Sequence, residues 1–263
     1  MELRASDIDV SGGQLSVLSL GEGPAVLFLH GWALDQRMWR QQYALADKGL
    51  RVVTVDRRGF GASSAPPDLT LETEDIMRVL DALSLEHVAL VGMSQGGRIA
   101  LRYAMASPER LSHLVLQGAP IDGFPTAPSD AEAVPVERYR DYLSRGDKNA
   151  FLNDWLSHPL LCHDRAVAAD VIDELAKGYA GRDLLEGVPD SYTINVFAAL
   201  RSLALPSLYI VGEHDTAWLK TVAETFEKLV PNGHAVSVPG AGHMCNVTRP
   251  DFYNNILLDL LMP

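Results

Sequence analysis

The chain has 263 residues, of which 47% are hydrophobic and 21% are charged, and these proportions are typical of a globular protein. Its formal net charge of −12 repels phosphate backbones, which argues against a nucleic-acid partner. Two cysteines, Cys162 and Cys245, are too few for a disulfide framework and have no metal-ligand spacing.

The N-terminal residues 1–7 are charged and lack an apolar core, so they do not resemble a secretory signal. No window reaches the roughly 18 apolar residues that a membrane helix needs. We therefore expect a cytoplasmic protein that does not bind membranes. The sequence carries no signal for its oligomeric state.

Short apolar runs and helical patterns alternate over the first half of the chain. Residues 3–20 alternate in polarity and turn at Ser11-Gly12-Gly13, which predicts an antiparallel hairpin at a sheet edge. Continuous apolar runs, typical of strands covered on both faces, then occupy residues 25–29, 52–55, 88–91 and 114–116. Helices are predicted over 35–48, ended by Gly49, and around the apolar face of Ile76, Val79, Leu80 and Leu83. This alternation predicts parallel strands joined by crossover helices.

The alternation stops between residues 122 and 195. Proline and alanine recur over 124–135, and helical patterns follow at 136–143, 150–156 and 165–179, without a buried strand. Afterwards a strand (208–211), a helix (217–229), a strand (235–238) and a final helix (252–261) are predicted. We therefore expect an α/β core built from residues 1–121 and 196–263, with a helical cap at 122–195 over one end of the sheet.

A candidate nucleophile lies between a predicted strand and a predicted helix. Gly92-Met93-Ser94-Gln95-Gly96 has the G-x-S-x-G pattern that places a reactive serine on such a turn. The sharp turn strains the serine backbone and exposes its hydroxyl, and side chains two residues before and after it would clash. A purely structural turn serine is the alternative interpretation.

A serine hydroxyl needs a base to become a nucleophile. Of the eight histidines, His243 is preceded by glycines in Gly240-Ala241-Gly242 and follows the last predicted strand. Glycines allow the backbone to bring the ring into a crowded site. His30 also follows a strand, but it precedes Gly31 and is predicted to brace a loop.

The acid that orients the base should follow another strand, between the serine and the histidine in the chain. Asp215 meets both conditions, because it comes just after the strand at 208–211. Glu213 and Asp122 are the alternatives. Two backbone amides are candidate oxyanion donors: Gln95 begins a helix directly after the serine, and Trp32 lies in the loop after an early strand, with Ala33 as its alternative.

These motifs together resemble the α/β-hydrolase family over essentially the whole chain. The stretches that carry the resemblance are 29–32 (Leu-His-Gly-Trp), 56–64, 91–97 and 240–243. The resemblance implies a mostly parallel, eight-stranded sheet flanked by helices, with a variable cap. It also implies a triad in the chain order Ser94, Asp215, His243, and no metal or organic cofactor.

The loops at 30–32 and 56–61 resemble those of esterases, lactonases and cofactor-free haloperoxidases. A serine at position 94 argues against epoxide hydrolases and haloalkane dehalogenases, whose nucleophile is aspartate. The expected function is a carboxylic ester hydrolase that cleaves esters or lactones of small, largely apolar substrates through an acyl-enzyme. The candidate pocket residues are the aromatic side chains Phe124, Phe151, Trp155 and Phe197, for which burial in the core is the alternative.

Two other functions stay open. The stretch from Ser94 to Arg98 is similar to a menaquinone-pathway lyase that uses the same triad. That reaction would need cations for a multi-carboxylate substrate, and the candidates are Arg98, Arg138, Arg140 and Arg145, whose alternative is a solvated surface. Some proteins of this fold are small-molecule receptors with an intact triad, which would leave a long-lived adduct at the serine.

Overall fold

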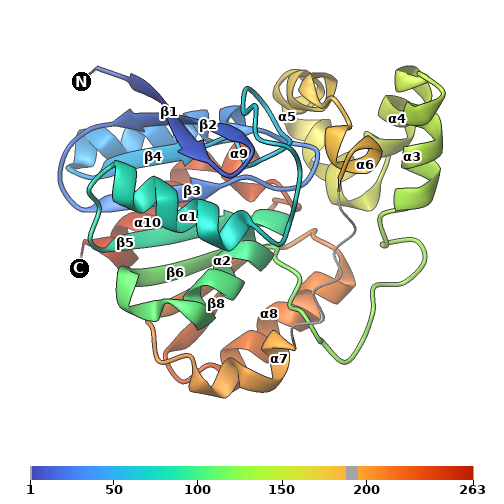
Figure 1. Cartoon of the computed structure of the whole chain (residues 1–263). Helices are drawn as coiled ribbons and strands as arrows, with labels where there is room; N and C mark the ends of the chain where they lie inside the picture. Colours follow the sequence, from blue (N-terminus) through green and yellow to red (C-terminus); the bar gives the residue numbers. More distant parts are fainter. Residues whose placement is uncertain (1, 188–194, 263) are drawn as a thin grey trace.

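The computed structural model describes residues 2–187 and 195–262. Within them, eight strands form one sheet in the order β1-β2-β4-β3-β5-β6-β7-β8 (Figure 1). The pairs β1–β2 and β2–β4 are antiparallel, and all other neighbours are parallel. The strands are β1 Arg4–Val10, β2 Gly13–Leu20, β3 Ala25–Leu29, β4 Arg51–Val55, β5 Val88–Met93, β6 Leu111–Gln117, β7 Ser207–Gly212 and β8 Gly233–Val238. The predicted eight-stranded, mostly parallel sheet is confirmed.

The helices fall into three groups along the chain. Before β6 come η1 Gln36–Lys48, α1 Glu72–Ala82, α2 Gln95–Ala106 and η2 Pro108–Arg110. Between β6 and β7 come α3 Val136–Ser144, α4 Lys148–Trp155, α5 Pro159–Gly178, α6 Arg182–Leu185, α7 Val196–Ala199 and η3 Leu200–Ser202. After β7 come α8 Ala217–Leu229, α9 Cys245–Thr248 and α10 Pro250–Leu261. Figure 1 shows that α3–α6 stand together at one end of the sheet; we call these four the insertion helices.

Local chemistry explains the predicted ends of the early elements. The hairpin turns at Gly12, whose φ of +83° favours glycine, and β1 lies at the edge of the sheet. The helix over Gln36–Lys48 is a 3₁₀ helix. The Asp35 carboxylate accepts the N–H of Arg37 at its start, and Gly49, with a φ of 91°, ends it.

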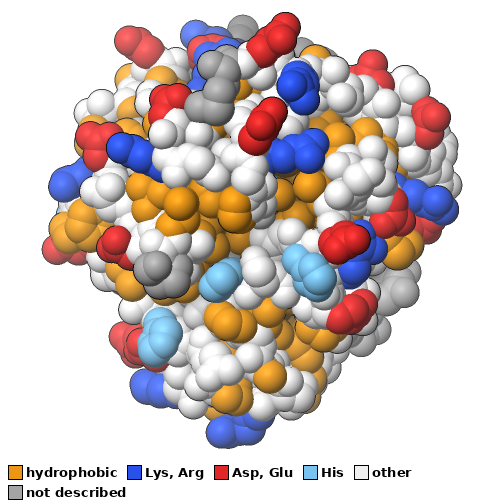
Figure 2. Space-filling view, turned by 90° about the vertical axis from the view of Figure 1, so that its left-hand side faces the viewer, with side chains coloured by type: hydrophobic (Ala, Val, Ile, Leu, Met, Phe, Trp, Pro, Cys, Tyr) orange, Lys and Arg blue, Asp and Glu red, His pale blue; other side chains and the backbone are white. Residues whose placement is uncertain are grey.

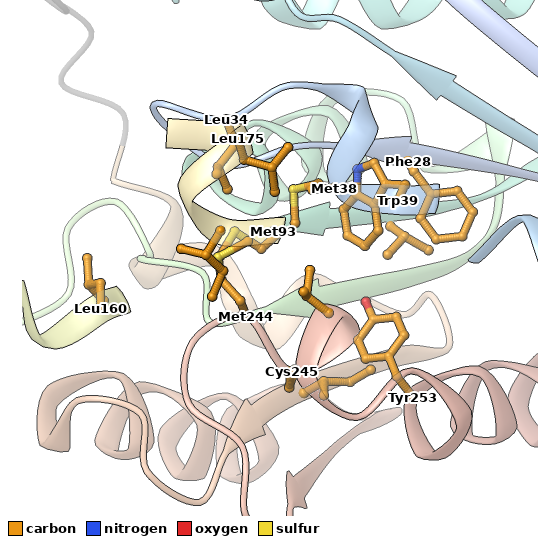
Figure 3. Close-up of a cluster of buried hydrophobic side chains, with 14 of the residues drawn as sticks. Phe28, Leu34, Met38, Trp39, Met93, Leu160, Leu175, Met244, Cys245 and Tyr253 are labelled. Carbon is orange, nitrogen blue, oxygen red and sulfur yellow. The ribbon is translucent and has the colours of Figure 1, made fainter. Parts of the chain in front are cut away.

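The sheet is covered on both faces, as the continuous apolar runs predicted. Along β3, Val26 and Phe28 belong to one buried cluster, and Leu27 and Leu29 to the other. The first cluster includes Trp39 of η1, and Figure 3 shows it beside Phe28. The same cluster continues into the insertion helices, which therefore share a core with the sheet. Its members there include Leu160, Leu161, Ile172 and Leu175 of α5.

The chain leaves and re-enters the core at neighbouring points. The N–H of Phe197 donates to the carbonyl oxygen of Asp122 (2.9 Å). A Cβ atom on Gly123 would lie 2.2 Å from Oδ1 of Asn195, so these residues are in close contact. The segment 122–195 therefore has adjacent ends, although its residues 188–194 lie outside the described residues.

The face turned away from the insertion helices mixes hydrophobic, acidic, basic and histidine side chains (Figure 2). In residues 2–187 and 195–262, no helix combines the length and apolar composition needed to cross a bilayer.

Candidate active site

Ser94 lies on the turn between β5 and α2 with a strained backbone, at φ 52° and ψ −119°. The turn is tight on both sides, because a Cβ on Gly92 would lie 2.5 Å from the carbonyl oxygen of Gly96. A Cβ on Gly96 would lie 2.4 Å from the carbonyl oxygen of His30. No side chain fits at either glycine of the motif, which explains the G-x-S-x-G pattern.

His243 and Asp215 form a buried pair beyond the ends of β8 and β7. Nδ1 of His243 lies 2.9 Å from Oδ2 of Asp215, and the two side chains are 3% and 1% exposed. With the Nδ1 proton directed at the carboxylate, Nε2 is the atom left to accept a proton. Among the described residues, nothing hydrogen-bonds to that Nε2.

The charge around His243 favours its protonated form. Burial alone would lower the pKa of His243, but the charge and hydrogen bond of Asp215, together with the charge of Asp164, outweigh burial and raise that pKa above its usual value. The ring becomes an effective base only above this raised pKa. An enzyme using it would lose activity as the pH falls.

The two alternative acids have other partners. Asp122 binds Arg98 (2.5 Å) and Arg102 (2.6 Å). Glu213 accepts the N–H of Gly240 (2.8 Å). Of the three carboxylates, the structure brings Asp215 to His243.

The His–Asp pair depends on a glycine that the sequence motifs did not reveal. Gly118 follows β6 with a φ of +51°, and a Cβ there would lie 2.6 Å from Nδ1 of His243 and 3.0 Å from Oδ2 of Asp215. The preceding Gln117 donates from Nε2 to the carbonyl oxygen of His243 (2.9 Å). The end of β6 thus supports the histidine, and a glycine after a strand was the available signal.

His30 braces the neighbouring loop, as its position just before Gly31 predicted. Its Nε2 accepts the N–H of Arg57 (3.0 Å), so its Nδ1 carries the proton and donates to the carbonyl oxygen of Gly31 (2.8 Å). Burial, with the nearby Arg57 charge, lowers the pKa of His30 to about 3. This ring therefore stays neutral at ordinary pH.

Arg57 connects this loop to the serine turn. Its guanidinium binds both oxygens of Glu72 (2.6 and 2.7 Å) and donates to Oε1 of Gln95 (2.9 Å). The Arg57 and Glu72 side chains are 2% and 4% exposed. Arg57, in the Asp-Arg-Arg stretch after β4, thus links its own loop to Glu72 of α1 and to Gln95 beside Ser94.

The side chain of Trp32 points into the insertion helices. Its ring contacts four aromatic rings there, at centroid distances of 5.1 to 6.4 Å: Tyr139, Phe151, Trp155 and Tyr179. Its Nε1 donates to Oδ2 of Asp183 (2.6 Å), while the Tyr179 hydroxyl donates to Oδ1 of the same carboxylate (2.5 Å). The loop after β3 is therefore fastened to the insertion helices.

Two cavities meet at Ser94. The larger has a volume of about 410 Å³, and its walls include Trp32, Gln95, Arg98 and Arg140. The smaller has about 30 Å³ and a mostly apolar wall. Its lining residues are Trp32, Leu34, Met93, Ser94, Val134, Trp155, Leu160, Leu161 and His243.

Of the four aromatic residues predicted to line the pocket, Trp155 contributes to the smaller cavity. Phe151 is fully buried against Trp32, and neither cavity includes it. Phe124 and Phe197 contact each other (5.4 Å between centroids), and neither lines these cavities. Phe151 packs among the aromatic rings of the insertion helices, whereas Phe124 and Phe197 pack against each other, and Phe124 also packs against Trp218 of α8.

Cys245 is fully buried, and burial raises the pKa of its thiol well above the usual value. It therefore stays protonated and is a poor nucleophile. Within the residues that the structure describes, no group of three or more His, Cys, Asp or Glu side chains could hold a metal ion.

Comparison with known proteins shows which family has this architecture. Residues 24–250 match the family model described as alpha/beta hydrolase fold. This chain belongs to the α/β-hydrolase family. A carboxylesterase is among the relatives of this chain, and an esterase is among the solved structures that share its fold.

Three similar proteins illustrate the range of the family. A putative 2-succinyl-6-hydroxy-2,4-cyclohexadiene-1-carboxylate synthase of Bacillus subtilis is 28% identical, over 91% of this chain and 92% of that protein. The carboxylesterase YbfK of Bacillus subtilis is 26% identical, over 99% and 88%. The crystal structure of a bromoperoxidase from Bacillus anthracis superposes with a TM-score of 0.81 at 26% identity, over 99% of this chain and 100% of that one.

Proposed function

We propose that this protein is a serine hydrolase that cleaves carboxylic esters or lactones of small, largely apolar substrates, with Ser94, His243 and Asp215 as its triad. One observation carries the proposal: a strained serine and an aspartate-paired histidine line the same small cavity. The Nε2 atom of that histidine has no hydrogen-bond partner among the described residues. It is therefore available to take the serine proton.

In this mechanism, His243 accepts the hydroxyl proton as Ser94 attacks the substrate carbonyl. Asp215 keeps the Nδ1 proton in place and stabilises the imidazolium that forms. His243 then passes the proton to the leaving alcohol, and an acyl-enzyme remains on the serine. Water activated by the same histidine releases the acid. No step requires a cofactor.

The backbone amides of Trp32 and Gln95 are the proposed oxyanion donors. Gln95 begins α2, where free N–H groups and the positive end of the helix dipole favour negative charge. Gly31, next to Trp32, brings its loop close to Ser94, because a Cβ there would lie 3.3 Å from the serine Cβ. One such donor is typically worth about 3–4 kcal/mol of transition-state stabilisation.

We further propose that the insertion helices form a cap over the site. Residues of the segment 122–195 that contains these helices supply part of the wall of both cavities: Val134, just before α3, contributes to both, Arg140 to the larger one and Trp155 to the smaller one. The volume of about 30 Å³ beside Ser94 and His243 suits a short apolar group, and the larger cavity suits the rest of the substrate.

The test is turnover of p-nitrophenyl esters of increasing acyl length and of a panel of small lactones, with Ser94→Ala measured in parallel. We expect the wild type to hydrolyse one of these classes, with a preference for short acyl chains. Removal of the nucleophile should lower kcat by about 10⁴-fold or more.

A fluorophosphonate probe completes this test. Labelling at Ser94 without turnover of any ester or lactone would keep the nucleophile and reject the substrate class. Absence of both labelling and turnover would reject the triad.

One observation favours a second candidate, a lyase that uses the same triad on a multi-carboxylate substrate. Arg98 and Arg140 both line the larger cavity beside Ser94. The similarity to the Bacillus subtilis synthase agrees with this reaction. Arg98→Ala should then abolish turnover of an anionic substrate, and intact turnover would eliminate this candidate.

A further inference from the structure

A buried carboxylate outside the proposed triad holds the backbone on both sides of His243. Asp164 lies on α5 and is 1% exposed. Its Oδ1 accepts the N–H of Gly242 (2.8 Å) and the hydroxyl of Thr248 (3.0 Å). Its Oδ2 accepts the N–H of Met244 (2.8 Å). One side chain from the insertion helices thus binds the residue before His243 and the residue after it.

This contact is close and firmly supported. A Cβ on Gly242 would lie 2.6 Å from Oδ2 of Asp164, so the carboxylate needs a glycine at that position. The α5 helix is itself fixed, because Leu160 and Leu175 belong to the same buried cluster as Met244 (Figure 3). Hydrogen bonds to a charged acceptor in a dry site are stronger than those between neutral groups.

We infer that Asp164 is a positioning residue for the base: it fixes the backbone around His243 and supplies a second negative charge that stabilises the imidazolium. This inference rests on the proposed function, in which His243 accepts the serine proton. The proposed triad lies entirely on loops at the ends of strands. Asp164 is therefore the point at which the insertion helices act on the chemistry of the base.

The main charges around His243 are the carboxylates of Asp215 and Asp164, because the other titratable groups nearby are neutral. Asp215 approaches from the loop after β7, and Asp164 approaches from α5. His158, just before α5, has a pKa lowered chiefly by burial, so it stays neutral near pH 7. The buried thiol of Cys245 is protonated, because burial raises its pKa. Loss of the Asp164 charge should therefore lower the pKa of His243.

The first variant is Asp164→Asn, which keeps the size of the side chain, removes its charge and replaces one acceptor with an amide donor. Asp170→Asn is the matched control, because Asp170 is exposed on the same helix. The His243 imidazole resonance is titrated by NMR in each protein and is assigned with a His243→Gln variant. We expect the midpoint to move to lower pH in Asp164→Asn and to stay in place in Asp170→Asn.

The kinetic measurement is kcat/KM for a p-nitrophenyl ester as a function of pH. For Asp164→Asn we expect a loss of about tenfold or more at the optimum, and an acidic limb displaced to lower pH. A merely structural role would lower the amount of folded protein or kcat without moving this limb. An unmoved NMR midpoint, or a variant as active as the control, would overturn the inference.

Asp164→Glu decides the matter if the asparagine variant does not fold. It keeps the charge but shifts the acceptors by one methylene, so kcat should fall while the acidic limb stays. Full kcat in this variant would reject positioning. The NMR titration needs no substrate, so a shifted midpoint in a protein that hydrolyses neither an ester nor a lactone would reject the proposed function and keep the electrostatic role of Asp164.

Discussion

The candidate site has two sides: the loops at the strand ends form one (the core side), and the insertion helices form the other (the insertion side). The two sides are built in different ways. On the core side, Ser94 directly follows β5, while Asp215 and His243 lie in the loops after β7 and β8, and parallel strands end at the same edge of a sheet. On the other side, Asp164 and Asp183 come from helices α5 and α6 and reach the loops at the strand ends through single carboxylates. The sheet topology thus brings the three candidate catalytic residues to one edge, and the insertion helices hold the loops of His243 and Trp32.

The largest effect that tests this division is expected at Gly118. Alanine there would place a methyl group 2.6 Å from Nδ1 of His243 and displace it from Asp215. We expect kcat/KM for an ester to fall by about 100-fold. Gly146→Ala is the control, because Gly146 also has a positive φ (+74°) but no atom within 4 Å of the added Cβ. Equal losses in both variants would mean that backbone strain, and not the collision, is responsible.

The next effect concerns the stability of the folded protein in acid, through His30 on the core side. His30 has a pKa of about 3 in the folded protein and 6.5 as its ordinary value, so the unfolded chain binds a proton first as the pH falls. The free energy of unfolding should therefore decrease from pH 6.5 towards pH 3, by about 2 kcal/mol at pH 5 from this group.

The check is urea unfolding of the wild type and of His30→Gln across this range of pH. The variant should be less stable at pH 7 and should lose less stability on acidification. Parallel curves for the two proteins would contradict the prediction.

An effect of similar size is expected where the insertion helices hold Trp32. Asp183→Asn can turn an amide N–H towards Nε1 of Trp32, and an unpaired buried donor costs about 1–3 kcal/mol of unfolding free energy. Tyr179→Phe is the matched variant, because it removes the other donor to the same carboxylate and leaves the Trp32 bond. Urea unfolding should show a larger loss of unfolding free energy for Asp183→Asn than for Tyr179→Phe. The reverse order would mean that the hydrogen bond from Tyr179 contributes more than the bond from Trp32.

The smallest effect is expected on the outer surface of the insertion helices. Arg145 pairs with Asp141 one turn earlier on α3, and both side chains are exposed. Arg145→Gln should change the free energy of unfolding by less than about 0.5 kcal/mol and leave ester turnover unchanged. A clear loss of turnover would show that this surface takes part in substrate binding.

The amino-acid sequence by itself determined the architecture of this protein. Continuous apolar runs predicted strands buried on both faces, and β3 shows the physical reason, because its alternate residues enter separate clusters. The glycines around Ser94 predicted a tight turn, since each excludes a side chain that would strike backbone atoms. Such patterns are local, so one strand or one turn is enough to reveal them.

Only the tertiary structure decided which distant residues meet. Asp164 and Asp183 belong to no sequence motif and lie outside the predicted helices, and the packing of α5 and α6 against the strand-end loops gives them their contacts. In the same way, Phe151 was predicted to line the pocket, but it is buried against Trp32. A helix exposes a different side to each neighbour, and its sequence does not specify where those neighbours lie; the packing of the whole chain does.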